Sequence, residues 1–298
     1  METNKIYFTP YRISTITCNA DIGNDINLNL NILFNHLDVT EDTKIIWAQF
    51  LKDDNDMSKG LYPKKKRKSK KDSTKKNRFD NQVTIIYKFN DVYMPNIKIF
   101  KNGNIQLTGI KDTNDTVTIV NEIIDNIKKI YNIDSSIIKD DENDVKRDKD
   151  YIINSLKYQN FKIRMINSDF KIYSNEELTE KFELKRKDVH RILISDKYNN
   201  KSSFQPGIYQ GVKLQYFWNK FSDKKDGICR CPVHCYGKNN GQSIGGCKKV
   251  TGALFESGSV LITGGISLEQ VDETYNYICN VLNENISEIR RTKFNLIF

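Results

Sequence analysis

Five side chains that bind soft metals lie within 19 residues in the last third of the chain. They are Cys229, Cys231, His234, Cys235 and Cys247. A tetrahedral zinc site needs four cysteine or histidine ligands on turns that can converge, and glycines at positions 237, 241, 245 and 246 give the backbone that freedom. The spacing predicts a structural zinc ion held by four of these five residues. Disulfide bonds and free thiols are the alternatives that the spacing leaves open.

The sequence singles out no group that could activate a cysteine as a nucleophile, neither a base nor a carboxylate to orient one. The most acidic stretch, Asp140 to Asp144, has the composition of a linker and not of paired catalytic carboxylates. Cys18 and Cys279 stand alone, which is not the distributed spacing of a secreted disulfide scaffold. We therefore expect a protein without enzymatic activity, in an intracellular, reducing compartment.

The ends and the apolar content of the chain give no sign of a membrane or of secretion. The first ten residues lack the apolar core of a signal peptide, and no run of 18 or more apolar residues occurs. A soluble protein with no membrane partner is expected.

The chain is basic, with 47 Lys and Arg against 38 Asp and Glu, a formal net charge of +9 and a pI near 9.0. A basic excess favours a polyanionic partner, although a composition rich in Lys, Asn and Ile is also what AT-rich genomes encode. The densest basic run is Lys64 to Lys71. It is typical of a solvated loop, of phosphate contact or of a nuclear-import-like signal.

An internal repeat is the most informative feature of the sequence. The segment from Phe100 to Gly109 has a counterpart from Phe255 to Gly264, and both run Phe-x-x-Gly and on to Thr-Gly. Each predicts a β-hairpin whose tight turn is centred on a glycine, Gly103 in the first copy and Gly258 in the second.

The order of the other expected elements is also the same in both halves. The first half has a strand at 11–17, a helix at 26–37, strands at 44–51 and 83–89, the hairpin, and a helix at 114–131. The second half has a strand at 161–166, a helix at 175–182, strands at 189–198 and 212–218, the hairpin, and a helix at 267–289. Corresponding landmarks lie about 150 residues apart, as a duplication requires.

The chain is thus expected to be α+β, with a first repeat at 1–132, a charged linker at 133–157 and a second repeat at 158–298. Two insertions break the symmetry. The first, at 52–78, carries the lysine run, and the second, at 219–249, carries the cysteines. Because they occupy different loops, we expect each to add a separate function.

At this point the sequence resembles the TATA-binding protein family, whose core is a tandem repeat of the same pattern. The two hairpins are similar to the family's Leu-Ile-Phe-x-Ser-Gly-Lys-x-Val-x-Thr-Gly, and the segment 13–17 to its first strand. Residues 204–209 resemble the family's Phe-Pro-Gly-Leu-Ile-Tyr, and residues 78–79 resemble the point in repeat one that is equivalent to that motif. Residues 161–163 resemble the start of the family's second repeat. The resemblance implies a saddle of two pseudo-symmetric repeats, a curved antiparallel sheet with helices on the convex face. The divergence is similar to that of versions encoded by large DNA viruses.

Alternation along the hairpin strands fits this resemblance independently. Lys98 and Phe100 share a face, while Ile97 and Ile99 point the other way. A sheet face with a large aromatic and few charges is unusual in contact with water. It suits the DNA minor groove, where apolar side chains wedge between base steps.

The resemblance also assigns a binding surface. The family's four intercalating phenylalanines correspond to Phe79, Phe100, Phe204 and Phe255. The other expected DNA contacts are Tyr11, Ile13, Thr15, Lys98, Gln106, Thr108, Met165, Asn167, Ala253, Leu261 and Thr263.

This chain departs from the family at two places. Tyr11 and Met165 stand where the family has asparagines that hydrogen-bond the central bases, and neither presents the paired donor and acceptor of an amide. Residues 197–201 contain two lysines where the family has an acidic patch for transcription factor IIB. The family's preference for a standard TATA element and its recruitment of transcription factor IIB therefore do not carry over to this chain.

By resemblance, the expected function is a general transcription initiation factor that binds and bends AT-rich promoter DNA as a monomer, with RNA polymerase and general transcription factors as partners. Its location would be the nucleus or a cytoplasmic viral factory, with packaging in the virion left open. Two alternatives are an assembly protein of a transcription complex that does not bind DNA, and a DNA-processing enzyme on a related fold.

Overall fold

A computed structural model describes residues 5–40, 42–52, 55–61, 81–139 and 148–291. The chain forms two compact units: residues 16–163, called here the N-terminal unit, and residues 1–15 with 164–298, called the C-terminal unit. The first fifteen residues thus belong to the same unit as the second half of the chain. The repeats expected at 1–132 and 158–298 and the linker at 133–157 stay predictions. The lysine run at 64–71 and Phe79 lie outside the described residues.

The N-terminal unit is an antiparallel sheet with the strand order β4-β3-β5-β6-β7-β2. Its strands are β2 (Arg12–Asp21, from residue 16 on), β3 (Ile45–Lys52), β4 (Asn55–Gly60), β5 (Gln82–Tyr87), β6 (Asn96–Phe100) and β7 (Asn104–Ile110). Its helices are α1 (Leu30–His36), α2 (Asn114–Ile133), the 3-10 turn η1 (Ser135–Ile137) and α3 (Lys149–Ser155). The insertion expected at 52–78 therefore begins with a strand, β4, that pairs with β3.

The C-terminal unit repeats this plan with the order β8-β13-β12-β10-β9, and adds β1 on β8 and β11 on β12. Its strands are β1 (Tyr7–Phe8), β8 (Gln159–Tyr173), β9 (Lys201–Gln205), β10 (Tyr209–Trp218), β11 (Lys238–Ser243), β12 (Gly246–Leu254) and β13 (Ser259–Gly265). Its helices are α4 (Arg186–Leu193), α5 (Leu268–Glu284) and α6 (Ile286–Ile289). No helix of the described residues is long and apolar enough to cross a membrane.

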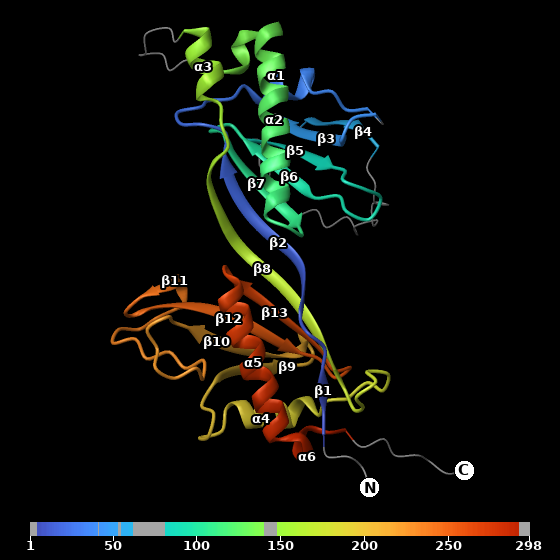
Figure 1. Ribbon diagram of the computed structural model, residues 1–298, viewed down its shortest axis with the longest axis vertical. Helices are drawn as coiled ribbons and strands as arrows, with labels where there is room; N and C mark the ends of the chain where they lie inside the picture. Colours follow the sequence, from blue (N-terminus) through green and yellow to red (C-terminus); the bar gives the residue numbers. More distant parts are fainter. Residues whose placement is uncertain (1–4, 41, 53–54, 62–80, 140–147, 292–298) are drawn as a thin grey trace, which may run out of the picture. The chain divides into compact units, whose positions relative to one another are not determined.

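One long helix covers one face of each sheet, α2 in the N-terminal unit and α5 in the C-terminal unit (Figure 1). Apolar residues at three- and four-residue spacing, such as Ile119, Ile123 and Ile127 of α2, are buried against the sheet. α5 begins where the Ser267 hydroxyl accepts a hydrogen bond from the Gln270 N–H. The expected fold class, an α+β protein with antiparallel sheets and helices on one face, is confirmed.

Both hairpin turns require a left-handed backbone at the predicted glycine. Gly103 has φ of 76° and Gly258 has φ of 74°, a region that residues with a Cβ enter at a cost of about 1 kcal/mol or more. The two turns differ in what surrounds them. A Cβ on Gly103 would meet side-chain atoms of Ile26 at 3.1 Å, whereas a Cβ on Gly258 would lie 2.4 Å from the Phe182 carbonyl oxygen.

Two expected elements of the second half are wrong. The strand expected at 189–198 is replaced by the helix α4, since Val189, Ile192 and Leu193 have helical spacing and are buried together. The helix expected at 175–182 does not form. There the Asn175 side chain accepts hydrogen bonds from the Thr179 and Glu180 N–H groups, a turn that competes with a helix.

Candidate nucleic-acid interface and metal centre

The sheet face opposite α2 carries a ladder of polar side chains in the N-terminal unit. Thr84 pairs with Lys98 across β5 and β6, Lys98 with Gln106 across β6 and β7, and Gln106 with Asn19 across β7 and β2. The residues between them along each strand, including Ile97 and Leu107, are fully buried on the helix side. The face that carries the predicted contacts Lys98, Gln106 and Thr108 is thus the one that helix packing leaves open.

Two amide side chains meet on this open face, Gln106 of β7 and Asn19 of β2. The Asn19 Oδ1 atom is shielded from water and has no hydrogen-bond partner among the described residues. An amide offers a donor and an acceptor side by side, which is the pattern that reads a base edge. The sequence analysis missed Asn19, although its alternation with Thr15 and Thr17 along β2 places it on the same face.

Phe100 ends β6 on this open face, opposite Gln82 of β5, and is half-buried. It lines a cavity of 520 Å³ together with Ile26, Asn27, Asn81, Lys101, Asn102 and Asn104. The aromatic ring is therefore surrounded by amides, with Asn81 before β5 and Asn104 at the start of β7. The Asn27 Oδ1 atom is also buried without a partner among the described residues.

On the open face of the C-terminal unit, the strands pair as they do in the N-terminal unit, but the paired residues are less polar. Leu261 of β13 pairs with Asp169 on one side and with Ala253 of β12 on the other. In the next row Thr263 pairs with Asn167 of β8. Asp169 would repel a phosphate backbone, but the Arg12 guanidinium donates a hydrogen bond to it over 2.9 Å.

Phe255 belongs to an aromatic cluster at the end of β12. Its ring centre lies 5.7 Å from that of Tyr209, edge to face, and the Lys213 ammonium lies 4.4 Å from the centre of the Tyr209 ring. Gly211 lies under both rings, where a Cβ would come within 2.9 Å of Tyr209 and 3.2 Å of Phe255. Tyr209 is the aromatic partner of Phe255, a role that the sequence analysis did not give it.

Two predicted contacts lie on the helix side of their strands. The Phe204 ring lies 5.4 Å from the Arg186 guanidinium at the start of α4. The Tyr11 hydroxyl donates to Asp272 of α5 over 2.6 Å, and its ring packs edge to face on Tyr275. Both side chains thus contact residues of a helix, and contact of Phe204 and Tyr11 with DNA stays a prediction.

The remaining predicted contacts occupy intermediate positions. Ile13 and Thr15 in β2 and Met165 in β8 are half-buried. The Thr15 hydroxyl is shielded from water and has no hydrogen-bond partner among the described residues.

The four cysteines of the insertion converge. The Sγ atoms of Cys229, Cys231, Cys235 and Cys247 all lie within 4.8 Å of one another. The Cys231 and Cys247 Sγ atoms are 3.3 Å apart, and those of Cys247 and Cys229 are 3.7 Å apart. Zinc–sulfur bonds of about 2.3 Å in a tetrahedron place sulfurs about 3.8 Å apart, so the four thiols fit one metal ion.

His234 is not part of this group. Its side chain is exposed and packs edge to face on Tyr236, with ring centres 4.5 Å apart. Of the five candidate ligands, the structure therefore brings together the four cysteines. Cys247 comes from β12 and the other three from the loop that precedes β11.

The surroundings of the thiols favour deprotonation of one of them. Burial acts to raise the pKa of Cys235, but the N–H groups of Gly237 and Cys247 and the neighbouring thiols outweigh it, so that the pKa lies below the usual value. The Gly237 N–H donates to the Cys235 Sγ over 3.3 Å. Burial raises the pKa of Cys247, which lies deepest. A cation among the sulfurs would reverse that shift, because metal-bound cysteines are thiolates.

This chain is similar in sequence to a viral protein. No family model matches the chain. A protein of Acanthamoeba polyphaga mimivirus named "TATA-box-binding protein-like" is 29% identical over 283 residues, which are 94% of this chain and 66% of the relative. The chain thus spans slightly less than two thirds of that protein's length. The sequence resemblance to TATA-binding proteins is confirmed.

Among solved structures, the TATA-binding protein of Methanococcus jannaschii, titled "Methanococcus jannaschii TBP", matches with a TM-score of 0.46 and 15% sequence identity. The match covers 93% of this chain and 99% of that one.

Proposed function

Given its similarity to a viral TATA-box-binding-protein-like factor, we propose that this chain is a transcription initiation factor that binds the minor groove of duplex DNA and bends it. The observation that carries the proposal is the position of Phe100 and Phe255. Phe100 ends β6, the first strand of its hairpin, and Phe255 directly follows β12, the first strand of the other hairpin. A role as core aromatics would not account for two phenylalanine side chains that are only half-buried.

Unstacking of a base step is the function that we assign to these two rings. It costs on the order of a few kcal/mol, and the wider contact of bent DNA with the protein offsets that cost. In the C-terminal unit we assign the second apolar contact to Tyr209 and not to Phe204. Lys213, which lies over the Tyr209 ring, would reach a phosphate beside the unstacked step.

Recognition of bases is assigned to the amides of the N-terminal unit. Tyr11 and Met165 replace the family's asparagines, and Asn19 and Gln106 supply amides at a different place on the open face. The preferred sequence should therefore differ from a standard TATA element while remaining rich in A·T pairs, whose minor-groove edges carry only acceptors.

Zinc is the metal that we propose for the four cysteines. A closed set of four thiolates is typical of structural zinc, and no position remains open for a substrate. The ion would join Cys247 of β12 to the preceding loop and so fix the shape of the insertion at 219–249. Zinc content of protein purified without chelator tests this; less than about a tenth of an equivalent would exclude it.

The proposed partners are AT-rich promoter DNA, RNA polymerase and general transcription factors, with one chain bound per site. We propose an intracellular location, in a nucleus or a viral factory, and no enzymatic activity. A second candidate is an assembly protein without DNA binding. It is favoured by the helix-side positions of Tyr11 and Phe204, two residues that the family's binding mode would need on the other face.

Selection of bound sequences from random duplexes decides between the two candidates. The proposal predicts an enriched AT-rich motif, and a bend when a duplex carrying the motif is tested by mobility of circularly permuted fragments. If no sequence is enriched and duplex DNA does not bind at low salt, the assembly role replaces the DNA-binding role.

A further inference from the structure

The insertion that carries the cysteines also exposes an unusual number of large apolar side chains. Phe221, Val233, Tyr236 and Ile244 are exposed by 57%, 76%, 68% and 83%, although all four lie within 24 residues. Single exposed apolar residues are normal, but a group of them on one small substructure marks an interaction site. The exposed side chains of these four residues are not part of the core between the sheet and α5.

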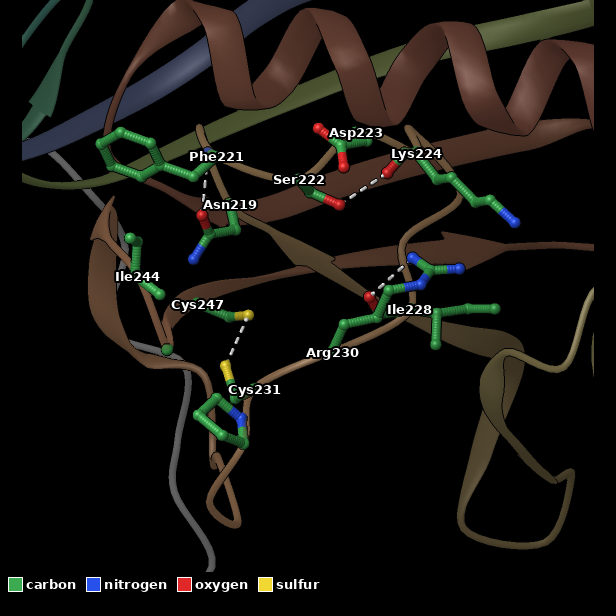
Figure 2. Close-up of a pocket in the computed structure, with 12 residues that line it drawn as sticks. Asn219, Phe221, Ser222, Asp223, Lys224, Ile228, Arg230, Cys231, Ile244 and Cys247 are labelled. Carbon is green, nitrogen blue, oxygen red and sulfur yellow. Dashed lines mark hydrogen bonds between the residues drawn. The ribbon is translucent and has the colours of Figure 1, made fainter.

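Phe221 and Ile244 border a cavity of 530 Å³ that opens beside the cysteines. Figure 2 shows Phe221, Ile244, Cys231 and Cys247 around the same hollow. The cavity is also lined by Asn219, Ser222, Asp223, Lys224, Ile228, Arg230, Pro232 and Gly245. The Asn219 side chain fixes one wall, since it accepts from the Phe221 N–H and donates to the Ser243 carbonyl. A volume of this size holds one or two apolar side chains of a partner.

The charge around the cavity selects the kind of partner. Residues 219–249 contain seven Lys and Arg and two Asp. Arg230 is paired with Asp226, and Lys225 with Glu273 of α5. Lys220 and Lys224 are exposed and make no ion pair among the described residues, so they remain available to an acidic ligand.

We infer that the cavity between Phe221 and Ile244 is a docking site for an acidic protein segment that inserts an aromatic or aliphatic anchor. The anchor would fill the apolar hollow, and flanking carboxylates would lie against Lys220 and Lys224. A phosphate backbone would satisfy the lysines but would leave Phe221, Ile244 and the hollow in water. This is why the surface fits a peptide better than a nucleic acid. The site goes beyond DNA binding and belongs to the C-terminal unit alone.

The test uses the full chain with its metal content measured, and a fluorescein-labelled peptide of about a dozen residues, acidic except for a central Phe-x-x-Leu. Fluorescence anisotropy should give a Kd on the order of 10 μM that weakens with salt. Phe221→Ser and Ile244→Ser should each raise that Kd about tenfold. Val92→Ser is the matched control, since Val92 is 86% exposed and belongs to the N-terminal unit, whereas the cavity belongs to the C-terminal unit. It should change nothing.

Further arms of the same experiment can overturn the inference. Replacement of Phe and Leu by Ser in the peptide, or of its acids by Gln, should abolish binding. Equal binding of either altered peptide, or no binding up to about 1 mM, would overturn the inference. The inference would also be overturned if Ile244→Ser lost duplex binding but kept its binding of the peptide. That result would show that this surface is part of the DNA interface. Unchanged melting and zinc content in both Ser variants show that the loop is still folded. DNA binding measured in parallel separates this outcome from a failure of the proposed function.

Discussion

The two hairpins share a backbone but differ in the surroundings of their phenylalanines. Phe100 lies among the amides of Asn81, Asn102 and Asn104. Phe255 instead packs on Tyr209 and over Gly211. The two hairpins therefore share the position of the phenylalanine but differ in the side chains around it. Amides beside Phe100 can form hydrogen bonds with base edges, whereas the aromatic surroundings of Phe255 would recognise mainly the shape of the DNA. We therefore expect the two units to contribute differently to affinity and to sequence preference.

The cysteine site provides the largest expected difference between the units. Cys247→Ser, or treatment with a chelator, should lower the free energy of unfolding of the C-terminal unit by about 3 kcal/mol or more, because the proposed ion would hold β12 to its loop. Amides of β10 and β12 should lose protection from hydrogen exchange, while those of β5 to β7 keep it. Cys279→Ala is the control, a buried thiol in α5 outside the cluster. Equal loss of protection in both units would contradict a local role.

The next largest difference is expected between the stability costs of replacing the two turn glycines, Gly258 and Gly103. Gly258→Ala should cost about 3 kcal/mol, because its Cβ would lie 2.4 Å from the Phe182 carbonyl in a left-handed backbone. Gly103→Ala should cost only about 1 kcal/mol, because the nearest atom is in the Ile26 side chain, which can move. Urea unfolding of both variants measures the comparison. Equal costs would mean that the environments of the two turns do not differ as described.

Truncation of the two wedges should separate binding from folding. Phe100→Ala and Phe255→Ala should each weaken binding to the selected duplex by about tenfold to a hundredfold and reduce the bend. Phe255→Ala should also destabilise the fold by about 1 kcal/mol, through the lost contact with Tyr209. Gel mobility and thermal melting of both variants give the two effects. A loss of about 3 to 5 kcal/mol with normal bending would instead identify a core aromatic.

The smallest effect expected is on sequence preference. Asn19→Val and Gln106→Val should leave stability and the bend nearly unchanged, but each should relax discrimination at one or two positions of the DNA site by about 1 to 2 kcal/mol. Repeating the duplex selection with each variant measures this. Val92→Ser, at an exposed position between β5 and β6, serves as the control. An unchanged motif in both amide variants would assign base reading to other residues.

Much of the fold follows from local patterns. The helices α2 and α5 and the two hairpins were predicted because apolar spacing and turn glycines act within a few residues. The short helix α4 was missed because its three buried residues, Val189, Ile192 and Leu193, fit a strand as easily as one helical turn. At the candidate site, the pool of metal ligands and the place of Phe100 and Phe255 in the hairpins were likewise visible in the sequence.

The sequence by itself determined the duplication, the turn glycines and the set of thiols, because each depends on residues close together in the chain. Only the tertiary structure decided that Tyr209 and not Phe204 accompanies Phe255, that Tyr11 packs on α5, and that Asn19 meets Gln106. The physical reason is that alternation predicts a face only while the register is unbroken. A register shift interrupts the β9–β10 pairing between Tyr209 and Lys213. In the β2–β7 pairing the extra residue is Gly109 of β7, so alternation along β2 gives the face of Asn19 but not its partner Gln106.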